Sequence, residues 1–497
     1  MAEPRIVDVV VVGLGVGGEE VAGRLAEAGL SVVGVERSLV GGECPYWGCV
    51  PSKMMIRAAN AIAEARRVDG LAGTAQVHPD WAPVAKRIRA EATDAWDDRV
   101  AVERFVGKGG QFVRGSGRLD GPGRVRVDDQ VFQARHGIVL GTGTRPSVPP
   151  VEGLADTPYW TNHQATEVEE LPESLLVLGG GAIGLELAQV FARFGVRVTL
   201  VEALDRVLAV EEPEASEVAA AALRADGVQI HTGVTAERVD HDGRRFTLRA
   251  GGTAYTGDRL LVVTGRRAHL DELGLETVGD ELGLETVGVR ADHRYLPVDD
   301  RLRVTDGVWA VGDVTGEGAF THVAMYQAGI VVADLLDRVR HADSRPDASG
   351  TASVTGGAMG AASTPAVTGS SGSAGTVPRA DYRALPRVTF TDPEVGAVGL
   401  TERQARERGL NVQVGVAQLG SSARGWIHRA DGLIKLVVDA DQGVLVGGTS
   451  VGPAGGEVLS ALVVAVHAAV PLAQLRDMIY AYPTFHRAIS EALRDLS

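Results

Sequence analysis

The feature that most constrains the fold is a strand, glycine turn, helix and strand arrangement that occurs twice. The first copy has a β-branched run at residues 5–12, the glycines Gly13, Gly15 and Gly18, and a second β-branched run that ends at Glu36. In such a unit the first glycine permits a tight turn, the second lets the backbone approach a pyrophosphate, and the third lets the helix pack on the strand. The acidic residue would hold ribose hydroxyls. The pattern predicts a doubly wound α/β domain that binds a dinucleotide.

The second copy carries Gly179, Gly181 and Gly184 and ends at Glu202, so that each acid stands 23 residues beyond the first glycine of its copy. Two complete copies predict two dinucleotides, or one dinucleotide and a degenerate relic. A carboxylate at Glu202 would accept ribose hydroxyls and repel a 2′-phosphate, which favours NADH over NADPH. Arg206, four residues on, works against that preference.

The composition excludes several classes of protein. The 497 residues are enough for two to four domains, and 45% apolar residues indicate a globular chain. A net charge of −15 argues against a nucleic-acid or anionic-membrane partner, because phosphates would repel this surface. The longest uncharged stretch, residues 458–475, contains Pro471 and is barely long enough to span a bilayer, so we interpret it as a buried helix. The N-terminal apolar run leads straight into a glycine motif, so we expect no signal peptide and a cytoplasmic location.

Two segments are predicted to be insertions. Residues 271–279 are repeated letter for letter at 280–288, which we interpret as a duplication in a surface loop. Residues 341–378 consist almost entirely of Ser, Gly, Ala, Thr, Pro and Val, and such a composition predicts a flexible linker. The residues after it have strand and helix patterns of their own and form a separate domain.

The only two cysteines, Cys44 and Cys49, lie close together in the sequence. A lone close pair indicates redox chemistry or half of a metal site, and because no further cysteine could complete a four-thiolate site we predict no metal centre. In a regular helix residues five apart are separated by roughly 8 to 9 Å, too far for a disulfide. Pro45 and Gly48 would let the segment depart from that geometry. A helix predicted at residues 51–67 would follow, and a helix N-terminus favours reactive thiolates.

Residues 41–53, GGECPYWGCVPSK, resemble the redox-active segment of the FAD-dependent pyridine nucleotide-disulfide oxidoreductases, the family of dihydrolipoamide dehydrogenase, glutathione reductase and mercuric reductase. The resemblance continues, in the family's order, at residues 140–146, 179–186, 264–267, 311–314 and 390–394. It implies two Rossmann-like dinucleotide-binding domains and a C-terminal α/β dimerisation domain. The expected boundaries are 1–150 for the FAD-binding domain (completed by 296–340), 151–295 for the NAD(P)-binding domain, 341–378 for the linker and 379–497 for the dimerisation domain.

The resemblance also implies cofactors and partners. FAD would occupy the first glycine motif with Asp313 on the flavin ribitol, and nicotinamide would occupy the second. Further cofactor contacts are implied at Gly42, Thr142, Gly143 and Gly265. The family's architecture implies a homodimer that acts on a small-molecule electron acceptor.

The resemblance gives each residue of the redox segment a role. Cys49 would be the charge-transfer thiolate against the flavin, and Cys44 the interchange thiol that meets the substrate. Lys53 and Glu186 match the family's ion pair beside the flavin and nicotinamide, where a buried ammonium stabilises negative charge on the reduced flavin.

The C-terminal signature departs from the family. The family has His-Pro-Thr followed shortly by Glu, and the histidine comes from the partner subunit as the acid and base of the thiol. This chain has Tyr482 in place of the histidine and Arg487 in place of the carboxylate. A phenol with a reference pKa of about 10 exchanges protons poorly at neutral pH. His486 could substitute if Pro483 begins a helix, because residues four apart share a helix face.

The redox segment departs from the family as well. Glu43 replaces the usual threonine, and Tyr46 and Trp47 replace the usual small residues between the cysteines, which would narrow the pocket or make it apolar.

The most favoured function is an NAD(P)H-dependent FAD oxidoreductase that passes electrons through a Cys44–Cys49 disulfide to a disulfide-type acceptor. Two alternatives remain: a quinone or metal-ion reductase that uses the flavin without dithiol acid–base chemistry, and a non-catalytic flavoprotein subunit.

Overall fold

The computed structural model describes residues 3–268, 270, 282–290, 294–343 and 377–496. Its contacts divide the chain into two compact units. The first comprises residues 1–40, 101–143 and 269–380, and the second comprises residues 41–100, 144–268 and 381–497. The first copy of the predicted loop duplication (271–279) and most of the predicted linker (344–376) lie outside the described residues. The four predicted domain boundaries stay predictions, because a division by contacts does not test them.

The first unit is built on a mixed sheet with the strand order β16-β17-β6-β1-β2-β3. Its strands are β1 (Arg5–Val12), β2 (Val32–Glu36), β3 (Gln111–Arg114), β4 (Gly117–Leu119), β5 (Arg124–Val127), β6 (Gln130–Leu140), β16 (Arg303–Thr305) and β17 (Val308–Ala310). The central strand β1 runs parallel to both neighbours, with Val10 paired to Val33 and to Ile138. Residues 9–12 are buried on both faces, as a valine-rich strand in the middle of a parallel sheet should be.

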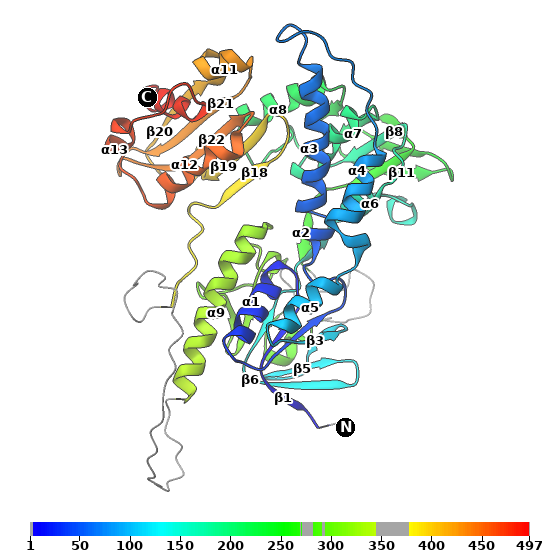
Figure 1. Ribbon diagram of the computed structural model, residues 1–497, viewed down its shortest axis with the longest axis vertical. Coiled ribbons are helices and arrows are strands. Elements are labelled where there is room, and N and C mark those ends of the chain that lie inside the picture. Colours follow the sequence, from blue (N-terminus) through cyan, green and yellow to red (C-terminus); the bar gives the residue numbers. More distant parts are fainter. Residues whose placement is uncertain (1–2, 269, 271–281, 291–293, 344–376, 497) are drawn as a thin grey trace. The chain divides into compact units, whose positions relative to one another are not determined.

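Two helices of this unit, α1 (Val16–Glu27) and α9 (Thr321–Asp343), lie side by side (Figure 1). The helical segments are α1 (Val16–Glu27), α5 (Arg99–Gly107), η4 (Leu284–Val287), η5 (Asp313–Thr315) and α9 (Thr321–Asp343). A Cβ at Gly17 of α1 would lie 3.3 Å from the Cβ of Ala324 on α9, so the glycine permits the close approach of the two helices. Helix α9 continues to Asp343 and so includes the first three residues of the predicted linker, 341–343.

The second unit contains a parallel sheet with the strand order β10-β9-β8-β14. Its strands are β8 (Ser174–Leu178), β9 (Arg197–Val201), β10 (Gln229–His231) and β14 (Arg259–Val262), accompanied by β11 (Ala236–His241), β12 (Phe246–Ala250) and β13 (Thr253–Gly257) in one small sheet and by β7 (Thr144–Pro146) and β15 (Arg266–Ala268) in another. Its helical segments are α2 (Glu43–Tyr46), α3 (Cys49–Arg66), α4 (Ala82–Arg87), η1 (Ile88–Ala92), η2 (Asp94–Trp96), η3 (Leu154–Asp156), α6 (Asn162–Glu167), α7 (Ala182–Arg193) and α8 (Pro213–Ala225). Helix α3 packs against α7 (Figure 1), and Met55, Ala59 and Phe191 belong to the apolar core that they share.

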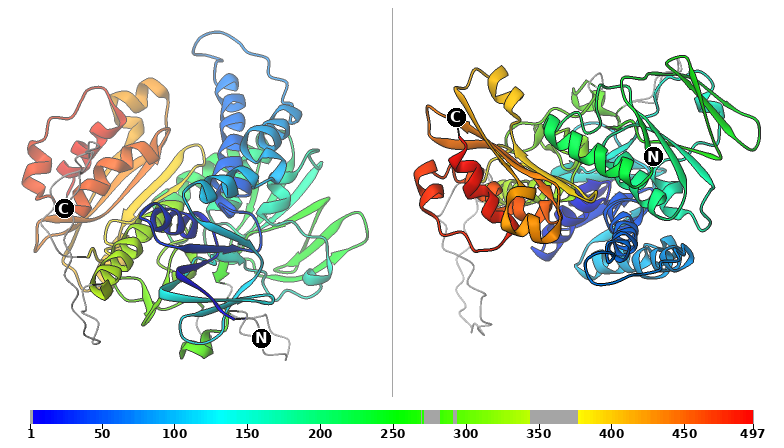
Figure 2. Two further views of the ribbon diagram at one scale, coloured as in Figure 1. Left: turned by 60° about the horizontal axis from the view of Figure 1, so that its bottom comes forward. Right: turned by 90° about the horizontal axis from the view of Figure 1, so that it is seen from above.

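The second unit also contains the C-terminal antiparallel sheet, with the strand order β18-β19-β22-β21-β20. Its elements are β18 (Pro386–Thr389), β19 (Glu394–Gly399), α10 (Glu402–Glu407), β20 (Val412–Gln418), η6 (Leu419–Ser421), α11 (Ala423–His428), β21 (Leu433–Asp439), β22 (Val444–Gly452), α12 (Gly455–His467), α13 (Leu472–Asp477), η7 (Phe485–Arg487) and α14 (Ala488–Arg494). Along β21, Ile434, Leu436 and Val438 share a core with α12 and α14, while Lys435 alternates to the other face. The helices of this C-terminal region are drawn in orange to red beside the sheet in Figure 2.

The prediction of one buried helix at residues 458–475 is wrong. Helix α12 ends at His467 and α13 begins after Pro471, because proline lacks the N–H that a continuous helix would need. Val464, in the middle of α12, is 63% exposed. Leu459 and Leu462 are buried against the sheet, so α12 is amphipathic rather than buried all round.

An ion cluster joins the C-terminal sheet to α8 within the second unit. The ammonium group of Lys435, which is 3% exposed, lies 3.0 Å from Glu212, 2.8 Å from Glu214 and 3.0 Å from Glu402. Burial alone would lower the pKa of Lys435, but its hydrogen bonds to the three carboxylates outweigh burial and raise it. The ammonium therefore stays charged and holds these elements together.

No helix among the described residues is long and apolar enough to cross a membrane. Within the same residues, no group of three or more His, Cys, Asp or Glu side chains is arranged to hold a metal ion.

Candidate active site

The first glycine motif closes the turn between β1 and α1. Gly13 has a φ of +88°, and a Cβ there would lie 2.5 Å from the carbonyl oxygen of Gly141, so only glycine fits. A Cβ at Gly18 would lie 2.0 Å from the carbonyl oxygen of Gly13, which shows how closely α1 packs on the turn. At Gly15 the nearest atom would be 4.0 Å away, so this backbone is open to a ligand.

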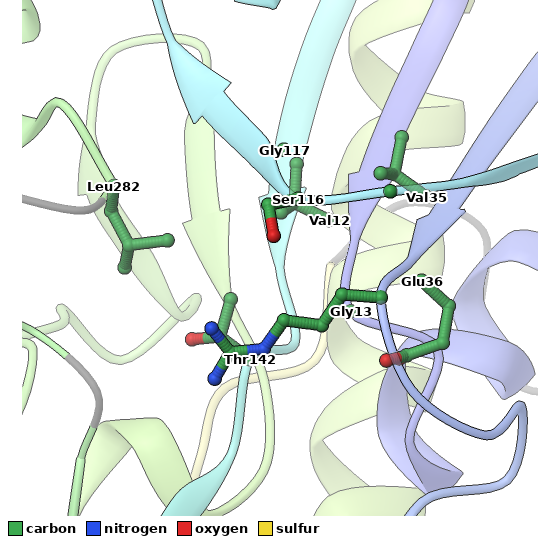
Figure 3. Close-up of a pocket in the computed structure, with 10 residues that line it drawn as sticks. Val12, Gly13, Val35, Glu36, Ser116, Gly117, Thr142 and Leu282 are labelled. Carbon is green, nitrogen blue, oxygen red and sulfur yellow. The ribbon is translucent and has the colours of Figure 1, made fainter. Parts of the chain in front are cut away.

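Glu36 ends β2 at the wall of a cavity of about 270 Å³ (Figure 3). Its buried carboxylate accepts hydrogen bonds from the backbone N–H groups of Leu14 at 2.8 Å and Ser38 at 2.7 Å. A carboxylate has further lone pairs, so Glu36 can still accept ribose hydroxyls. The cavity is lined by Val12, Gly13, Val35, Glu36, Arg37, Gly115, Ser116, Gly117, Thr142 and Leu282.

The hydroxyl of Thr142 is buried in this cavity wall and has no hydrogen-bond partner among the described residues. A buried polar group without a partner is costly, and it indicates a partner that a bound molecule supplies. The next residue, Gly143, has a φ of +66° with open space where a Cβ would stand. Together with the glycine turn and Glu36, these groups fit the ribose and pyrophosphate of FAD.

Asp313 begins the short η5 turn of the same unit. The fully buried Gln327 accepts a hydrogen bond from the backbone N–H of Gly312 at 2.7 Å and donates one to the hydroxyl of Thr315 at 3.0 Å. Gln327 therefore fixes the turn on both sides of Asp313. It carries no motif of its own in the sequence, and the sequence did not point to it.

The second glycine motif repeats the geometry of the first. Gly179 has a φ of +117°, and a Cβ there would lie 2.5 Å from the carbonyl oxygen of Val263. A Cβ at Gly184 would lie 2.1 Å from the carbonyl oxygen of Gly179, whereas one at Gly181 would meet nothing within 4 Å. This turn between β8 and α7 is therefore also shaped for a phosphate group.

Glu202 closes the second motif as Glu36 closes the first. Its carboxylate accepts hydrogen bonds from the backbone N–H groups of Gly180 at 2.5 Å and Leu204 at 2.7 Å. The guanidinium group of Arg206 donates to the carbonyl oxygen of Ala209 at 2.9 Å. Arg206 is thus engaged by the backbone of its own loop.

The two cysteines lie at the junction of α2 and α3. Cys44 is partly buried within α2, and Cys49 is exposed as the first residue of α3. A Cβ at Gly48 would lie 3.1 Å from the carbonyl oxygen of Glu43 and 3.4 Å from the Cα of Cys44, so the glycine lets the chain before Cys49 fold against Cys44. The helix predicted from residue 51 begins at Cys49, which puts this thiol at the positive end of the dipole, where a thiolate is stabilised.

Lys53 and Glu186 form an ion pair between α3 and α7. The ammonium nitrogen lies 2.9 Å from Oε2 of Glu186, and the backbone N–H of Phe390 donates to Oε1 at 2.9 Å. The phenyl ring of Phe390 lies 4.6 Å from the ammonium. Lys53 follows Cys49 by one helical turn, so the cation and the thiol share a face of α3. Phe390 was not predicted as a site residue.

The side chain of Glu43, next to Cys44, is held by helix α6 and strand β15. Its carboxylate lies 2.6 Å from Nε2 of His163, accepts from Nδ2 of Asn162 at 2.9 Å, and lies 3.6 Å from Arg266. Burial works to raise the pKa of Glu43, but the hydrogen bond from His163 and the charge of Arg266 outweigh it and hold this pKa below its usual range. Glu43 is therefore ionised at neutral pH.

Two family models match the chain. The model described as pyridine nucleotide-disulphide oxidoreductase matches residues 7–328, and the dimerisation domain of the same family matches residues 385–493. The chain belongs to this family. It is therefore an oxidoreductase enzyme, and membership implies FAD and NAD(P)H as cofactors. The predicted fold class, two Rossmann-like domains and an α/β dimerisation domain, is confirmed, and the alternative of a non-catalytic subunit is set aside.

Similar proteins span several activities within the family. The chain is 31% identical to a dihydrolipoyl dehydrogenase of Thermus scotoductus, covering 98% of this chain and 97% of the relative. It is 32% identical to a mercuric reductase of Streptomyces lividans, covering 98% and 95%. Among solved structures, the HOCl-induced flavoprotein disulfide reductase RclA from Escherichia coli superposes with a TM-score of 0.77 at 26% identity, covering 98% of this chain and 99% of that one.

The C-terminal segment does not have the geometry that would pair Tyr482 with His486. Pro483 begins no helix, because η7 starts at Phe485 and α14 only at Ala488, so residues 482 and 486 do not share a helical face. The ring of Tyr482 is 69% exposed and lies 5.4 Å from the guanidinium of Arg487.

Proposed function

We propose that this enzyme takes electrons from NAD(P)H, with NADH preferred, and delivers them through the Cys44–Cys49 pair to a small disulfide-type acceptor. The observation that carries the proposal is the arrangement of α3, in which Cys49 begins the helix and Lys53, one turn later, pairs with Glu186. FAD, when bound, supplies the two-electron exchange between nicotinamide and disulfide.

The chain's own groups support each part of that reaction. The N-terminus of α3 stabilises a thiolate at Cys49. Lys53 supplies a positive charge on the same helix face, and Glu186 compensates it, because a half-buried ammonium without a partner would be costly. Cys44, in helix α2 before Gly48, is the thiol that would exchange with the acceptor.

The preference for NADH rests on Glu202. Its carboxylate stands where a 2′-phosphate would be repelled. The engagement of Arg206 with the carbonyl oxygen of Ala209 supports the preference, because a guanidinium held by the backbone is less available to a phosphate.

The roles of the two cysteines are tested by absorption spectroscopy of the purified flavoprotein after reduction with two electrons. A long-wavelength band that is lost in Cys49→Ser and kept in Cys44→Ser is the expected result. The reverse pattern would exchange the two roles. No band in the wild type would contradict the disulfide mechanism.

A second candidate function is reduction of a metal ion or a quinone without dithiol chemistry. It is favoured by Tyr482, whose exposed phenol lies against Arg487 where the family has an imidazole and a carboxylate. A mercuric reductase is among the relatives, and a solved structure of an RclA variant is described as a Cu(II) complex. Turnover of quinones or metal ions that survives replacement of both cysteines would favour this function.

The proton-transfer question is tested by Tyr482→His combined with Arg487→Glu. The imidazole restores a group that exchanges protons near neutral pH, and the carboxylate orients it, so disulfide turnover should rise more than with either single change. The gain should stay below the roughly 10²- to 10⁴-fold of a fully placed acid or base. No gain in either variant would mean that the natural acceptor needs no thiol protonation.

We also propose a cytoplasmic homodimer. The match to the dimerisation domain supports the dimer. Exposed apolar side chains of the C-terminal region, among them Trp426, Val464 and Ile479, are suited to a subunit contact. Only two cysteines, both in the redox segment, suit a reducing compartment. Analytical ultracentrifugation of the full chain tests the dimer.

A further inference from the structure

Helix α6 contacts the short turn that carries Cys44 at two points, residues Glu43 and Trp47, which are four positions apart in the sequence. At the first point, His163 and Asn162 hold the carboxylate of Glu43, at 2.6 and 2.9 Å. At the second point, the indole of Trp47 stacks on the ring of His163, with ring centres 4.2 Å apart and planes 4° from parallel.

Two hydrogen bonds complete the second point. The indole N–H of Trp47 donates to Glu167 at 2.6 Å, and the carbonyl oxygen of Trp47 accepts from Nδ2 of Asn162 at 3.0 Å. Residues from both ends of α6 thus contact the first residue of α2 or the residue that follows its end. This α6 clamp, made of Asn162, His163 and Glu167 against Glu43 and Trp47, leaves the turn little freedom to move.

The contacts of His163 with Glu43 and Trp47 make it a residue that holds the turn in place. Its ring lies over the Glu43 and Trp47 face of α2. Cys44 follows Glu43 by one residue, and successive side chains on a helix are turned by about 100°. In a regular helix the side chain of Cys44 would therefore point to a different face from that of Glu43.

We propose that the α6 clamp, with His163 as its central positioning residue, stabilises the Cys44–Cys49 disulfide relative to the dithiol by keeping Cys44 within reach of Cys49. This inference rests on the proposed redox role of the pair. Reduction breaks the S–S bond with two electrons and one proton, together the hydride of NADH, and leaves a thiol on Cys44 and a thiolate on Cys49. A turn that is free to move after reduction would close again less readily, because the effective concentration of one sulfur at the other falls.

An electrostatic role for the same residues predicts the opposite sign. Two further charged groups lie at the clamp: Glu167 accepts from the indole that stacks on His163, and Arg266 lies 3.6 Å from Glu43. If the charge of Glu43 governed the couple, removing its partner His163 would leave more negative charge near the new thiolate and would favour the disulfide. Loosening the clamp favours the dithiol instead, so the direction of the change separates the two.

The test is a redox titration of the FAD-bound enzyme against glutathione buffers at pH 7, with the thiols of the peptide containing residues 43–53 counted by alkylation and mass spectrometry. His163→Leu should lower the equilibrium constant for disulfide formation about tenfold, which corresponds to a potential higher by about 30 mV. His163→Arg should restore most of the stability, since a guanidinium can both stack on Trp47 and donate to Glu43. Glu43→Gln, which keeps an acceptor, should change the constant by less than His163→Leu.

The matched control is His136→Leu, which removes a half-buried histidine that lies 3.7 Å from Asp8 in the other unit and should leave the potential at its wild-type value. If His163→Leu loses flavin, Trp47→Leu provides the same test, because it removes the stack and the bond to Glu167. An unchanged or lower potential in these variants overturns the clamp while the redox role stands. A wild-type enzyme with no two-thiol step in the titration overturns both.

Discussion

The two glycine motifs are built alike but differ in how far they are enclosed. In both, the first glycine has a positive φ, a Cβ on the third would collide with the carbonyl oxygen of the first, and the acid after the second strand accepts two backbone N–H bonds. At the first motif Glu36 is buried beside a cavity. At the second, Gly181 and residues 203–205 are exposed.

This difference suits a cofactor that stays and one that exchanges. An enclosed site buries most of its ligand and releases it slowly, whereas an exposed loop lets a nucleotide arrive and leave in each turnover. Both carboxylates accept hydrogen bonds from backbone N–H groups of their glycine loops, so Glu36 and Glu202 stabilise these loops whether or not a ribose is bound.

The largest expected effect comes from replacing the third glycine of each motif, because the two variants should lose different functions. Gly18→Ala places a Cβ 2.0 Å from the carbonyl oxygen of Gly13, and Gly184→Ala places one 2.1 Å from that of Gly179. Each should destabilise its own turn by roughly 3 kcal/mol, the upper end of overpacking costs. Gly18→Ala should be purified without flavin, whereas Gly184→Ala should keep its flavin and lose reduction by NADH, as followed by flavin absorbance in a stopped-flow instrument.

Gly107→Ala, at the end of helix α5 and outside both motifs, is the matched control for both, because a Cβ there meets nothing within 4 Å. It should bind and oxidise NADH within a few-fold of the wild type. Equal loss of flavin in Gly18→Ala and Gly184→Ala would show that the two motifs do not act separately.

The second prediction concerns the acid of the exposed motif. Glu202→Ala should reduce the ratio of kcat/KM for NADH over NADPH by about 10- to 100-fold, because a hydrogen bond to a charged group contributes about 1.5–3 kcal/mol. Arg206→Ala should leave the ratio nearly unchanged, since this guanidinium donates to the carbonyl oxygen of Ala209. A fall in NADPH activity alone in Arg206→Ala would show that the arginine does reach a 2′-phosphate.

Local sequence patterns predicted those strands and helices whose limits depend on residues close together in the sequence. The first strand has the predicted limits, residues 5–12, and helix α3 begins two residues earlier than predicted, because Gly48 rather than Pro51 ends the preceding turn. The family resemblance implied the pairing of Lys53 with Glu186, which are 133 residues apart. Periodicity alone could not have done so.

Contacts that no motif marks could not be predicted. Asn162 and His163 belong to a short helix without a recognisable pattern, and only the packing of the second unit brings them to Glu43. Gln327 is likewise an ordinary helix residue until the fold puts its amide between Gly312 and Thr315. The prediction of one buried helix at residues 458–475 was wrong because an apolar composition does not show which face of a helix packs against the rest of the protein.

The smallest expected effect tests whether the cavity of the first motif is completed by its cofactor. Thr142→Val removes a buried hydroxyl that has no partner among the described residues, so the free energy of unfolding of the flavin-free protein should stay the same or rise. Affinity for FAD should nevertheless fall about 2- to 10-fold, because the lost bond contributes about 0.5–1.5 kcal/mol. Thr391→Val is the control: its hydroxyl already donates to the carbonyl oxygen of Pro393 at 2.8 Å, so the variant should lose stability and keep its affinity for FAD. Isothermal titration of the flavin-free variants with FAD, together with their urea unfolding curves, measures both quantities. If Thr142→Val lowers the stability of the flavin-free protein without lowering its affinity for FAD, the hydroxyl has a partner within the protein. The cavity of the first motif then needs no cofactor to complete its hydrogen bonds.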